Sequence, residues 1–192
     1  MLKKEMSYFA RVTKRLPSPT PSSPEHQNVV IMGRKTWDSI PSKFRPLAHR
    51  TNLIISRQER LESVSPALLE SGNVLVASDI RSGLSLLEAR VKEGKAMPVG
   101  RVFVIGGAAI YKAALEMEQA RNVLLTRVQG EWDCDTVFPV DLAREGQGWA
   151  RKSREELEGF VGEEFAGGSA VLEEEVQGGG KVKYEFMLYQ RE

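Results

Sequence analysis

The chain has 192 residues, of which 41% are hydrophobic and 28% charged, and 27 Lys and Arg nearly balance 26 Asp and Glu for a net charge of +1. The length suits one domain with a real core, and the balanced charge excludes the strongly basic surface of a general nucleic-acid binder. No apolar run approaches the roughly 18–20 residues that cross a bilayer, and the single cysteine excludes an internal disulfide framework. These numbers predict a soluble globular domain from a reducing compartment.

The first part of the chain predicts one helix and then alternating strands and helices. Leu2 to about Lys14 has the spacing of an amphipathic helix, and the Pro-rich stretch at 16–27 predicts a loop. Continuous apolar runs, typical of strands buried on both faces, lie at Asn28–Met32, Asn52–Ser56, Asn73–Ala77, Val102–Ile105 and Val123–Val128. Helices are expected at Arg34–Ile40, from about Ile80 to Lys92 and from Ala108 to about Glu118. This alternation predicts a mostly parallel sheet with right-handed crossovers.

The C-terminal part has a different pattern. Residues 145–168 are polar and Gly-rich, with a charged stretch at 151–158 that predicts a solvated helix face. Ala170–Val176 and Val182–Tyr189 alternate apolar and polar residues around a Gly-rich turn, which predicts a hairpin. The expected fold class is therefore α/β, with three layers: a mostly parallel central sheet, flanking helices and a C-terminal antiparallel hairpin. One domain is expected over residues 1–192.

Two strand-to-helix junctions have the composition of phosphate sites. At Gly33–Thr36 a glycine, two cationic side chains and a hydroxyl accompany a predicted helix start, and Gly106–Ala109 offers backbone amides beside small side chains. Each junction by itself is more simply a turn, since neither matches GxGxxG or a P-loop. Ser56 and Arg57 end a third strand. Because ligands of open parallel sheets bind beyond the carboxyl ends of the strands, the three together favour a phosphorylated dinucleotide.

Glu5 is the second candidate site residue. At about 100° per residue its side chain projects between Phe9 and Val12, within the apolar stripe that also contains Leu2 and Met6. One interpretation is a glutamate at the rim with its carboxylate in water. The other is a carboxyl group in an apolar pocket, where desolvation raises its pKa. Thr126, a polar residue in an otherwise apolar strand, is a candidate partner.

The segment Val30–Pro41 (VIMGRKTWDSIP) resembles dihydrofolate reductase, of a eukaryotic and fungal type. The similarity continues through ordered motifs over nearly the whole chain: RPL at 45–47, RTN at 50–52, ISR at 55–57, VIGGAAIY at 104–111, LTR at 125–127, DTVFP at 135–139 and KYEF at 183–186. The resemblance implies an NADP-dependent oxidoreductase of one-carbon metabolism that reduces dihydrofolate to tetrahydrofolate with NADPH. It also implies small-molecule partners (dihydrofolate and antifolate inhibitors), no metal, nucleic acid or membrane, and a cytoplasmic monomer, with a mitochondrial pool as the alternative location.

The resemblance further implies roles for individual residues. Glu5 is expected to hold the pterin ring by paired charge-assisted hydrogen bonds and to assist protonation, with support from Thr126. Arg50 is expected to clamp the glutamyl carboxylate bidentately. Pocket walls are expected from Met6, Phe9, Ile40, Pro41, Leu47 and Ile105. Cofactor contacts are expected from Gly33, Arg34, Lys35, Thr36, Ser56, Arg57, Gly106, Gly107, Ala108, Ala109, Ile110 and Tyr111.

The sequence departs from the family pattern before Glu5. The family begins with an apolar strand, a mobile Gly-rich loop and a Leu-Pro-Trp segment, and the sequence as written has none of these. A missing central strand leaves backbone groups unpaired, at about 1–3 kcal/mol each against a total stability of roughly 5–15 kcal/mol. We therefore expect the chain as written to fold poorly and to have little reductase activity. The alternatives are a non-catalytic remnant that binds cofactor or a partner, and a related pteridine or pyrimidine reductase, against which Arg50 and the Glu5 helix argue.

Overall fold

The computed structural model describes residues 2–16, 25–58, 60–134, 136–144, 146–165, 170–176 and 179–192. Most of the predicted Pro-rich loop and parts of the 145–168 stretch and of the Gly-rich turn lie outside these ranges. The chain forms two compact units. We call Thr13–Leu115 the middle unit, and Met1–Val12 with Glu116–Glu192 the terminal unit. The expectation of a single domain stays a prediction.

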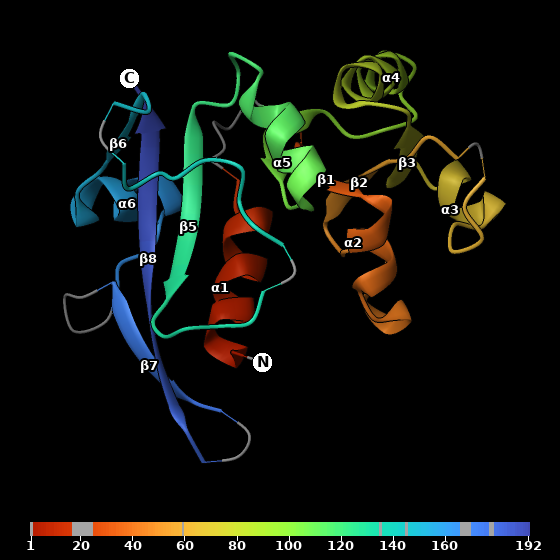
Figure 1. Ribbon diagram of the computed structural model, residues 1–192. Helices are drawn as coiled ribbons and strands as arrows, with labels where there is room; N and C mark the ends of the chain where they lie inside the picture. The colour runs from red at the N-terminus through yellow and green to blue at the C-terminus, as the bar shows by residue number, and fades with distance from the viewer. Residues whose placement is uncertain are drawn as a thin grey trace. The chain divides into compact units, whose positions relative to one another are not determined.

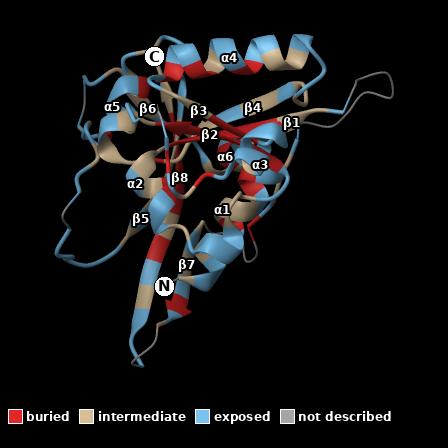
Figure 2. Ribbon diagram, turned by 90° about the vertical axis from the view of Figure 1, so that its right-hand side faces the viewer, coloured by how far each residue is buried: buried red, intermediate tan, exposed pale blue. Residues whose placement is uncertain are grey.

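The middle unit is built on a parallel sheet whose strand order is β3-β2-β1-β4. Its strands are β1 (Gln27–Gly33), β2 (Arg50–Ile55), β3 (Val74–Ala77) and β4 (Val99–Val104). Ile31 lies opposite Leu53 on one side and Val104 on the other, and every residue of β2 is buried. The buried residues gather along β1 and β2 in Figure 2. The continuous apolar runs thus predicted central strands correctly, because both faces of these strands are covered.

The helices of the middle unit are α2 (Arg34–Ser39), α3 (Pro66–Glu70), α4 (Ile80–Lys92) and α5 (Ala108–Leu115), with the 3-10 turn η1 (Ser42–Phe44). Asp79 and Ser82 form a capping box at the start of α4, which agrees with the expected start at about Ile80. Gly83 lets α4 approach β2 closely, since a Cβ there would lie 2.8 Å from the Leu53 methyl groups. The helix α5 is shorter than expected, and α3 was not predicted because five residues show little periodicity.

The terminal unit contains an antiparallel sheet of β5 (Asn122–Val128), β6 (Trp149–Arg151), β7 (Val171–Glu175) and β8 (Lys181–Arg191). The long strand β8 pairs with the other three, so β5 runs beside it in Figure 1 rather than joining the parallel series. The predicted hairpin is confirmed as β7 and β8. The partner of β5 could not be read from its own apolar pattern, because pairing depends on residues some 60 positions later.

Two helices of the terminal unit pack on one face of this sheet. They are α1 (Lys3–Lys14), whose last residues belong to the middle unit, and α6 (Arg154–Val161). The Tyr8 ring stacks on Phe186 of β8 with centroids 3.8 Å apart, and Phe165, just after α6, lies 5.6 Å from Phe186. The buried face of α1 therefore centres on Tyr8 and Val12, whereas Met6 of the predicted stripe is 46% exposed.

Candidate active site

The terminal unit places Glu5 beside Thr126. Thr126 Oγ1 donates a hydrogen bond of 3.2 Å to Glu5 Oε1. Thr126 lies opposite Phe186 in the β5–β8 ladder, so the two side chains share the sheet face on which Tyr8 packs. Glu5, one helical turn before Tyr8, meets that face as well. Thr126, the partner predicted from the sequence, therefore lies beside the Glu5 carboxyl group, because the alternation of side chains along β5 places it on this face of the sheet.

The surroundings of Glu5 raise the pKa of its carboxyl group. Burial is the largest cause, and repulsion from the Glu174 carboxylate adds to it. The Thr126 hydrogen bond favours the charged form and opposes both. Glu5 is only half-buried, so its carboxyl group combines a partly apolar setting with access from solvent. Such a group can bind a polar ligand and exchange a proton with it.

The other two predicted residues on α1 are placed differently. Met6 is largely exposed and Phe9 is half-buried. Tyr8 was not among the residues predicted for the site. It is 6% exposed, and its hydroxyl is the buried side-chain polar atom without a hydrogen-bond partner among the described residues. Burial raises the pKa of this hydroxyl strongly, and Glu163 and Glu5 add to the effect. The tyrosine thus stays neutral beside the Glu5 carboxyl group.

In the middle unit Arg50 opens β2 and is 5% exposed. Its Nη1 donates to Thr13 Oγ1 at 2.8 Å and its Nε donates to the carbonyl oxygen of Ala48 at 3.1 Å. Burial lowers the pKa of the guanidinium, whose ordinary value is so high that it stays charged. Two neutral acceptors therefore orient a cation that a carboxylate ligand can neutralise.

The predicted apolar wall residues of the middle unit are not equally buried. Ile40, Leu47 and Ile105 pack against the core cluster around Trp37, while Pro41 is exposed. Leu47 is fixed further because its N–H donates to Asn52 Oδ1 at 2.9 Å. The side chains of Ile40, Leu47 and Ile105 thus combine core contacts with partial exposure.

The two phosphate-type junctions of the middle unit come together. They follow the neighbouring parallel strands β1 and β4, and Gly33 N donates to the carbonyl oxygen of Gly106 at 2.8 Å. Thr36 Oγ1 faces the glycine pair, since a Cβ on Gly106 or Gly107 would lie 3.6 or 3.7 Å from it. Gly106 has φ of 118°, which side-chain-bearing residues rarely adopt. Gly106 is buried against Tyr111 and Thr36, whereas the backbone of Gly107 forms a partly exposed surface beside the Thr36 hydroxyl.

The start of α5 adds amide donors to this surface. Ile110 and Tyr111 make the first hydrogen bonds of the helix, both to the Gly107 carbonyl oxygen. The N–H groups of Ala108 and Ala109 precede that first turn, and small side chains leave them accessible. An anion placed there meets backbone amides and the positive end of an eight-residue helix. These residues fit the phosphate group of a nucleotide.

The cationic side chains near these strand ends differ in their ion pairing and exposure. Arg34 pairs with Asp38 at 3.2 Å, an exposed i,i+4 ion pair. Lys35 and Arg57 are exposed. Ser56 Oγ accepts a hydrogen bond of 3.0 Å from Gln58 N, at the end of the next strand, β2. A phosphate bound here therefore competes with Asp38 for Arg34, which the sequence did not indicate.

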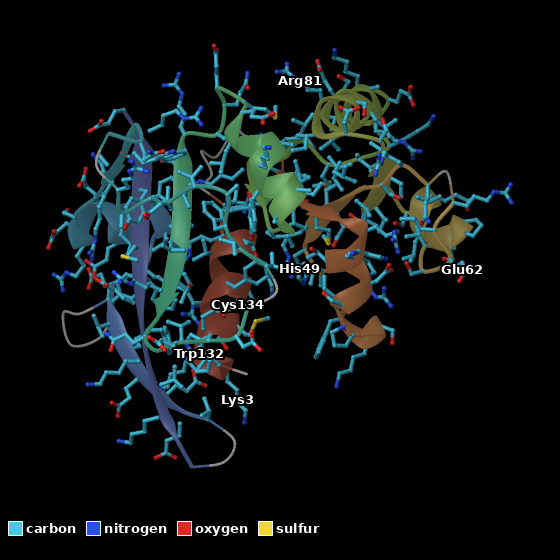
Figure 3. The ribbon with its side chains drawn as sticks, in the orientation of Figure 1. Lys3, His49, Glu62, Arg81, Trp132 and Cys134 are labelled. Atoms are coloured by element: carbon cyan, nitrogen blue, oxygen red, sulfur yellow. The ribbon has the colours of Figure 1, made fainter. Side chains whose placement is uncertain are left out.

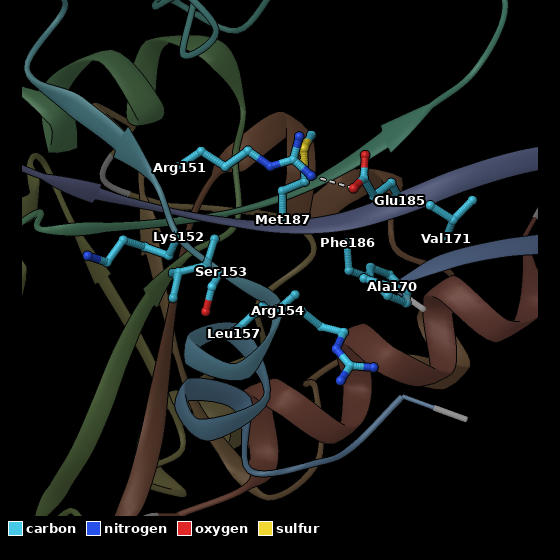
Figure 4. Close-up of a pocket in the computed structure, with 11 residues that line it drawn as sticks. Arg151, Lys152, Ser153, Arg154, Leu157, Ala170, Val171, Glu185, Phe186 and Met187 are labelled. Carbon is cyan, nitrogen blue, oxygen red and sulfur yellow. Dashed lines mark hydrogen bonds and ion pairs between the residues drawn. The ribbon is translucent and has the colours of Figure 1, made fainter. Parts of the chain in front are cut away.

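A separate cleft lies in the terminal unit. Figure 4 shows it between β8 and the turn that joins β6 to α6. Its volume is about 220 Å³. Its three cationic residues are all ion-paired: Arg151 with Glu185, Lys152 with Glu156 at 3.0 Å and Arg154 with Glu155 at 3.4 Å. None of the residues predicted for substrate or cofactor lines it. The cleft is a charged surface feature apart from the candidate site.

The described ranges contain neither a metal-ligand cluster nor a membrane-spanning helix. No cluster of three or more His, Cys, Asp and Glu side chains there could hold a metal ion. No helix in those ranges is both long and apolar enough to cross a membrane. A parallel sheet with an open amide surface at its strand ends, and a half-buried carboxyl group on α1, define a class of protein: an α/β protein equipped for a phosphorylated ligand and for proton chemistry.

Comparison with known proteins identifies the family. The family model described as dihydrofolate reductase matches residues 23–160. The chain is 39% identical over 163 residues to dihydrofolate reductase of Pneumocystis carinii, covering 84% of this chain and 75% of that protein. It is 34% identical to the Candida albicans enzyme, covering 99% and 85%. The structure of Schistosoma mansoni dihydrofolate reductase matches with a TM-score of 0.69 and 26% identity, over 99% of this chain and 85% of that one. The chain belongs to the dihydrofolate reductase family, as its sequence motifs indicated.

Proposed function

We propose that the chain catalyses the NADPH-dependent reduction of 7,8-dihydrofolate to 5,6,7,8-tetrahydrofolate, the CH–NH oxidoreduction of one-carbon metabolism. The observation that carries this proposal is the half-buried Glu5 carboxyl group with its Thr126 hydrogen bond, in a chain of this family. The relatives compared above are named as reductases, so a non-catalytic remnant is not favoured. The chain is proposed to act as a monomer on small molecules, without nucleic acid, membrane or metal.

Glu5 is the residue that we assign to the proton chemistry. A pterin carries a ring N–H and an exocyclic amino group side by side, which match the two oxygens of one carboxylate. Because the pKa of the Glu5 carboxyl group is raised, it lies nearer to neutral pH. The group can therefore both accept those hydrogen bonds and pass a proton. Thr126 holds one oxygen of the carboxyl group, and so fixes the plane in which a ligand is bound.

The residues for the rest of the substrate follow from its chemistry. Arg50 presents an oriented, buried guanidinium to the carboxylate of the glutamyl tail. The flat pterin and aminobenzoyl rings need apolar contacts, and these are assigned to Met6, Phe9, Ile40, Pro41, Leu47 and Ile105. Antifolate inhibitors, with the same ring and tail chemistry, are proposed to use the same residues.

The residues at the strand ends fit NADPH. When bound, NADPH supplies the hydride that the reduction needs. The Gly106–Ala109 amides and Thr36 suit its pyrophosphate, and Gly33 allows the two junctions to approach. Arg34, Lys35, Ser56 and Arg57 are assigned to its phosphates, with Arg57 favouring the 2′-phosphate. Ile110 and Tyr111, together with Ile105, are assigned to the nicotinamide end.

The experiment that tests this function compares the wild-type chain with Glu5→Gln. The low activity expected from the sequence stays an untested prediction, whereas the relatives that match 84% and 99% of this chain are named as reductases. We therefore expect wild-type protein to oxidise NADPH in the presence of dihydrofolate, and the variant to lose about 100-fold in kcat/KM, the scale of general acid–base catalysis. The Kd for NADPH should stay within about twofold. The exposed change Glu173→Gln is the matched control and should keep wild-type kinetics. Folded wild-type protein that binds NADPH without reducing dihydrofolate would contradict the function, whereas full activity of Glu5→Gln would remove Glu5 from it.

A further inference from the structure

Glu174 is a buried carboxylate that the catalytic assignments above do not use. It lies on β7 and is 8% exposed, whereas its neighbours Glu173 and Glu175 on the same strand are exposed. Strand alternation explains the difference, because successive side chains point to opposite faces of the sheet. A charged group almost never occupies such a position unless it has partners.

The partners of Glu174 lie at the start of α1, about 170 residues earlier in the chain. Glu174 Oε1 accepts a hydrogen bond of 2.6 Å from Lys3 N, and Oε2 accepts one of 3.0 Å from Lys4 N. The first N–H groups of a helix have no partner within the helix, and its N-terminus carries partial positive charge. Glu174 supplies from a strand the cap that an N-terminal side chain usually supplies. Lys3, at this end of α1, is labelled in Figure 3, and Figure 1 shows the end of the helix near β7.

A third hydrogen bond fixes Glu174 to the sheet itself. Tyr184 of β8 is fully buried and its hydroxyl donates to Glu174 Oε2 at 3.3 Å. Burial together with the neighbouring Glu174 charge raises the pKa of Tyr184 to about 12, so this hydroxyl remains a donor. Glu174 therefore bridges the first turn of α1 to the strand that pairs with β5.

Glu5 lies within that first turn. Its place along the sheet face is set at one end by the Glu174 cap and at the other by Tyr8 on Phe186. The described groups that interact with Glu5 lie on α1 itself and on three strands: Thr126 of β5 donates to it, Glu174 of β7 repels it, and Tyr8 of α1 and Tyr184 of β8 stay neutral beside it. Glu174 is the one negative charge in this set, besides Glu5.

We propose that Glu174 is a positioning residue for the reaction: by capping the first turn of α1 from β7, it holds the Glu5 carboxyl group at Thr126 and keeps a second negative charge beside it. This assignment rests on the proposed function. It differs from a general stabilising role because it makes the protonation of Glu5 depend on the charge of Glu174. The charge and the cap can be separated by substitution.

The charge is tested with Glu174→Gln, which keeps an acceptor oxygen and the side-chain length but removes the negative charge. The probe is the 13C side-chain signal of Glu5 in glutamate-labelled protein, assigned by its loss in Glu5→Gln, followed over pH. We expect the midpoint of the Glu5 titration to move to lower pH in Glu174→Gln. It should not move in Glu173→Gln, which removes the same charge from the other face of β7. An unmoved midpoint in Glu174→Gln would overturn the proposal.

The cap is tested with Glu174→Ala and Glu174→Asp. Loss or shortening of the side chain should displace the first turn of α1 and lower kcat/KM for dihydrofolate by about tenfold to 100-fold, the scale of a 1 Å misplacement. Glu174→Gln should recover most of that loss, and the Kd for NADPH should stay constant in all three. Wild-type kinetics in a folded Glu174→Ala would count against the proposal. If wild-type protein reduces no dihydrofolate, the proposed function fails, but the 13C titration still decides whether Glu174 controls Glu5.

Discussion

Thr126 Oγ1 donates to Glu5 Oε1 at 3.2 Å, joining the middle of β5 to the first turn of α1. The hydroxyl favours the ionised carboxyl group, while burial and Glu174 favour the protonated one. The protonation of Glu5 is therefore set by burial and by opposing contributions from β5 and β7, and the contributions of Thr126 and Glu174 can each be removed by one substitution.

Thr126→Val should move the Glu5 titration in the direction opposite to Glu174→Gln. Loss of the donor disfavours the charged carboxylate, so the pKa of Glu5 should rise further. We expect kcat/KM at pH 7 to fall about tenfold, as a hydrogen bond of about 1.4 kcal/mol implies. The pH titration of the Glu5 13C signal checks the first expectation, and Thr126→Ser, which keeps the hydroxyl, is the control. A lower midpoint in Thr126→Val would contradict this account.

Glu5 should also make the stability of the protein depend on pH. Its pKa in the folded state is raised above the ordinary value of 4.5, so the folded state binds this proton more tightly than the unfolded state. The stabilisation is fully present below the ordinary pKa and is lost as pH rises through the folded pKa. The side chain of Glu5→Gln does not titrate. The Tm of Glu5→Gln should therefore rise relative to that of wild type as pH increases from 4.5 towards neutrality.

Thermal unfolding followed by circular dichroism at several pH values measures this difference. Glu173→Gln is an informative comparison, because the Lys181 hydrogen bond and charge lower the pKa of Glu173. Its contribution has the opposite sign: it is present above the ordinary pKa and is lost as pH falls. If the Tm difference between Glu5→Gln and wild type stayed constant over this pH range, burial would not shift the pKa of Glu5.

Arg50→Lys should weaken substrate binding and spare the chemical step. A lysine cannot make the contact to Thr13 Oγ1 and also present two parallel N–H groups to a carboxylate. We expect the KM for dihydrofolate to rise about tenfold or more, with kcat nearly unchanged. Steady-state kinetics with dihydropteroate, which lacks the glutamyl group, provides the check. Equal losses on both substrates would mean that Arg50 acts through the fold instead, and Arg11→Lys at an exposed ion pair should change neither.

Substitution of Gly106 and of Gly107, the two glycines after β4, should have different effects: one on the stability of the protein and the other on NADPH binding. Gly106→Ala places a side chain at φ of 118°, at a cost of about 1–3 kcal/mol in the free energy of unfolding. In Gly107→Ala the new Cβ meets only Thr36 Oγ1, at an ordinary contact distance of 3.7 Å, so the free protein should be nearly as stable as wild type. The methyl group would stand on the open amide surface, however, and NADPH affinity should fall.

Urea unfolding and fluorescence titration with NADPH measure these two quantities in both variants. Gly159→Ala in α6, where an added Cβ would meet nothing within 4 Å, is the control and should leave NADPH affinity unchanged. If Gly107→Ala bound NADPH as tightly as wild type, the amide surface at 106–109 would not be the place of the pyrophosphate.

Local patterns explain which parts of this fold could be predicted. The runs at 28–32 and 52–56 became the central strands β1 and β2, and the approximate start of α4 was predicted, because hydrophobic periodicity acts over a few positions. The place of Tyr8 in the core was not predicted, since on sequence alone the apolar stripe could be centred on Met6 as well. The stacking of Tyr8 on Phe186 decides which side of α1 is buried.

For the candidate site as well, some features could be predicted from the sequence and others could not. The sequence by itself determined the residue types: a carboxyl group within the apolar stripe of the first helix, a threonine in an apolar strand, and two glycine junctions after parallel strands. Only the tertiary structure decided that Gly33 bonds to Gly106 and that Glu174, in a run of three glutamates, caps α1. The physical reason is distance along the chain: alternation and helical spacing are local, whereas a backbone amide at residue 3 finds its acceptor at residue 174 only once the sheet has formed.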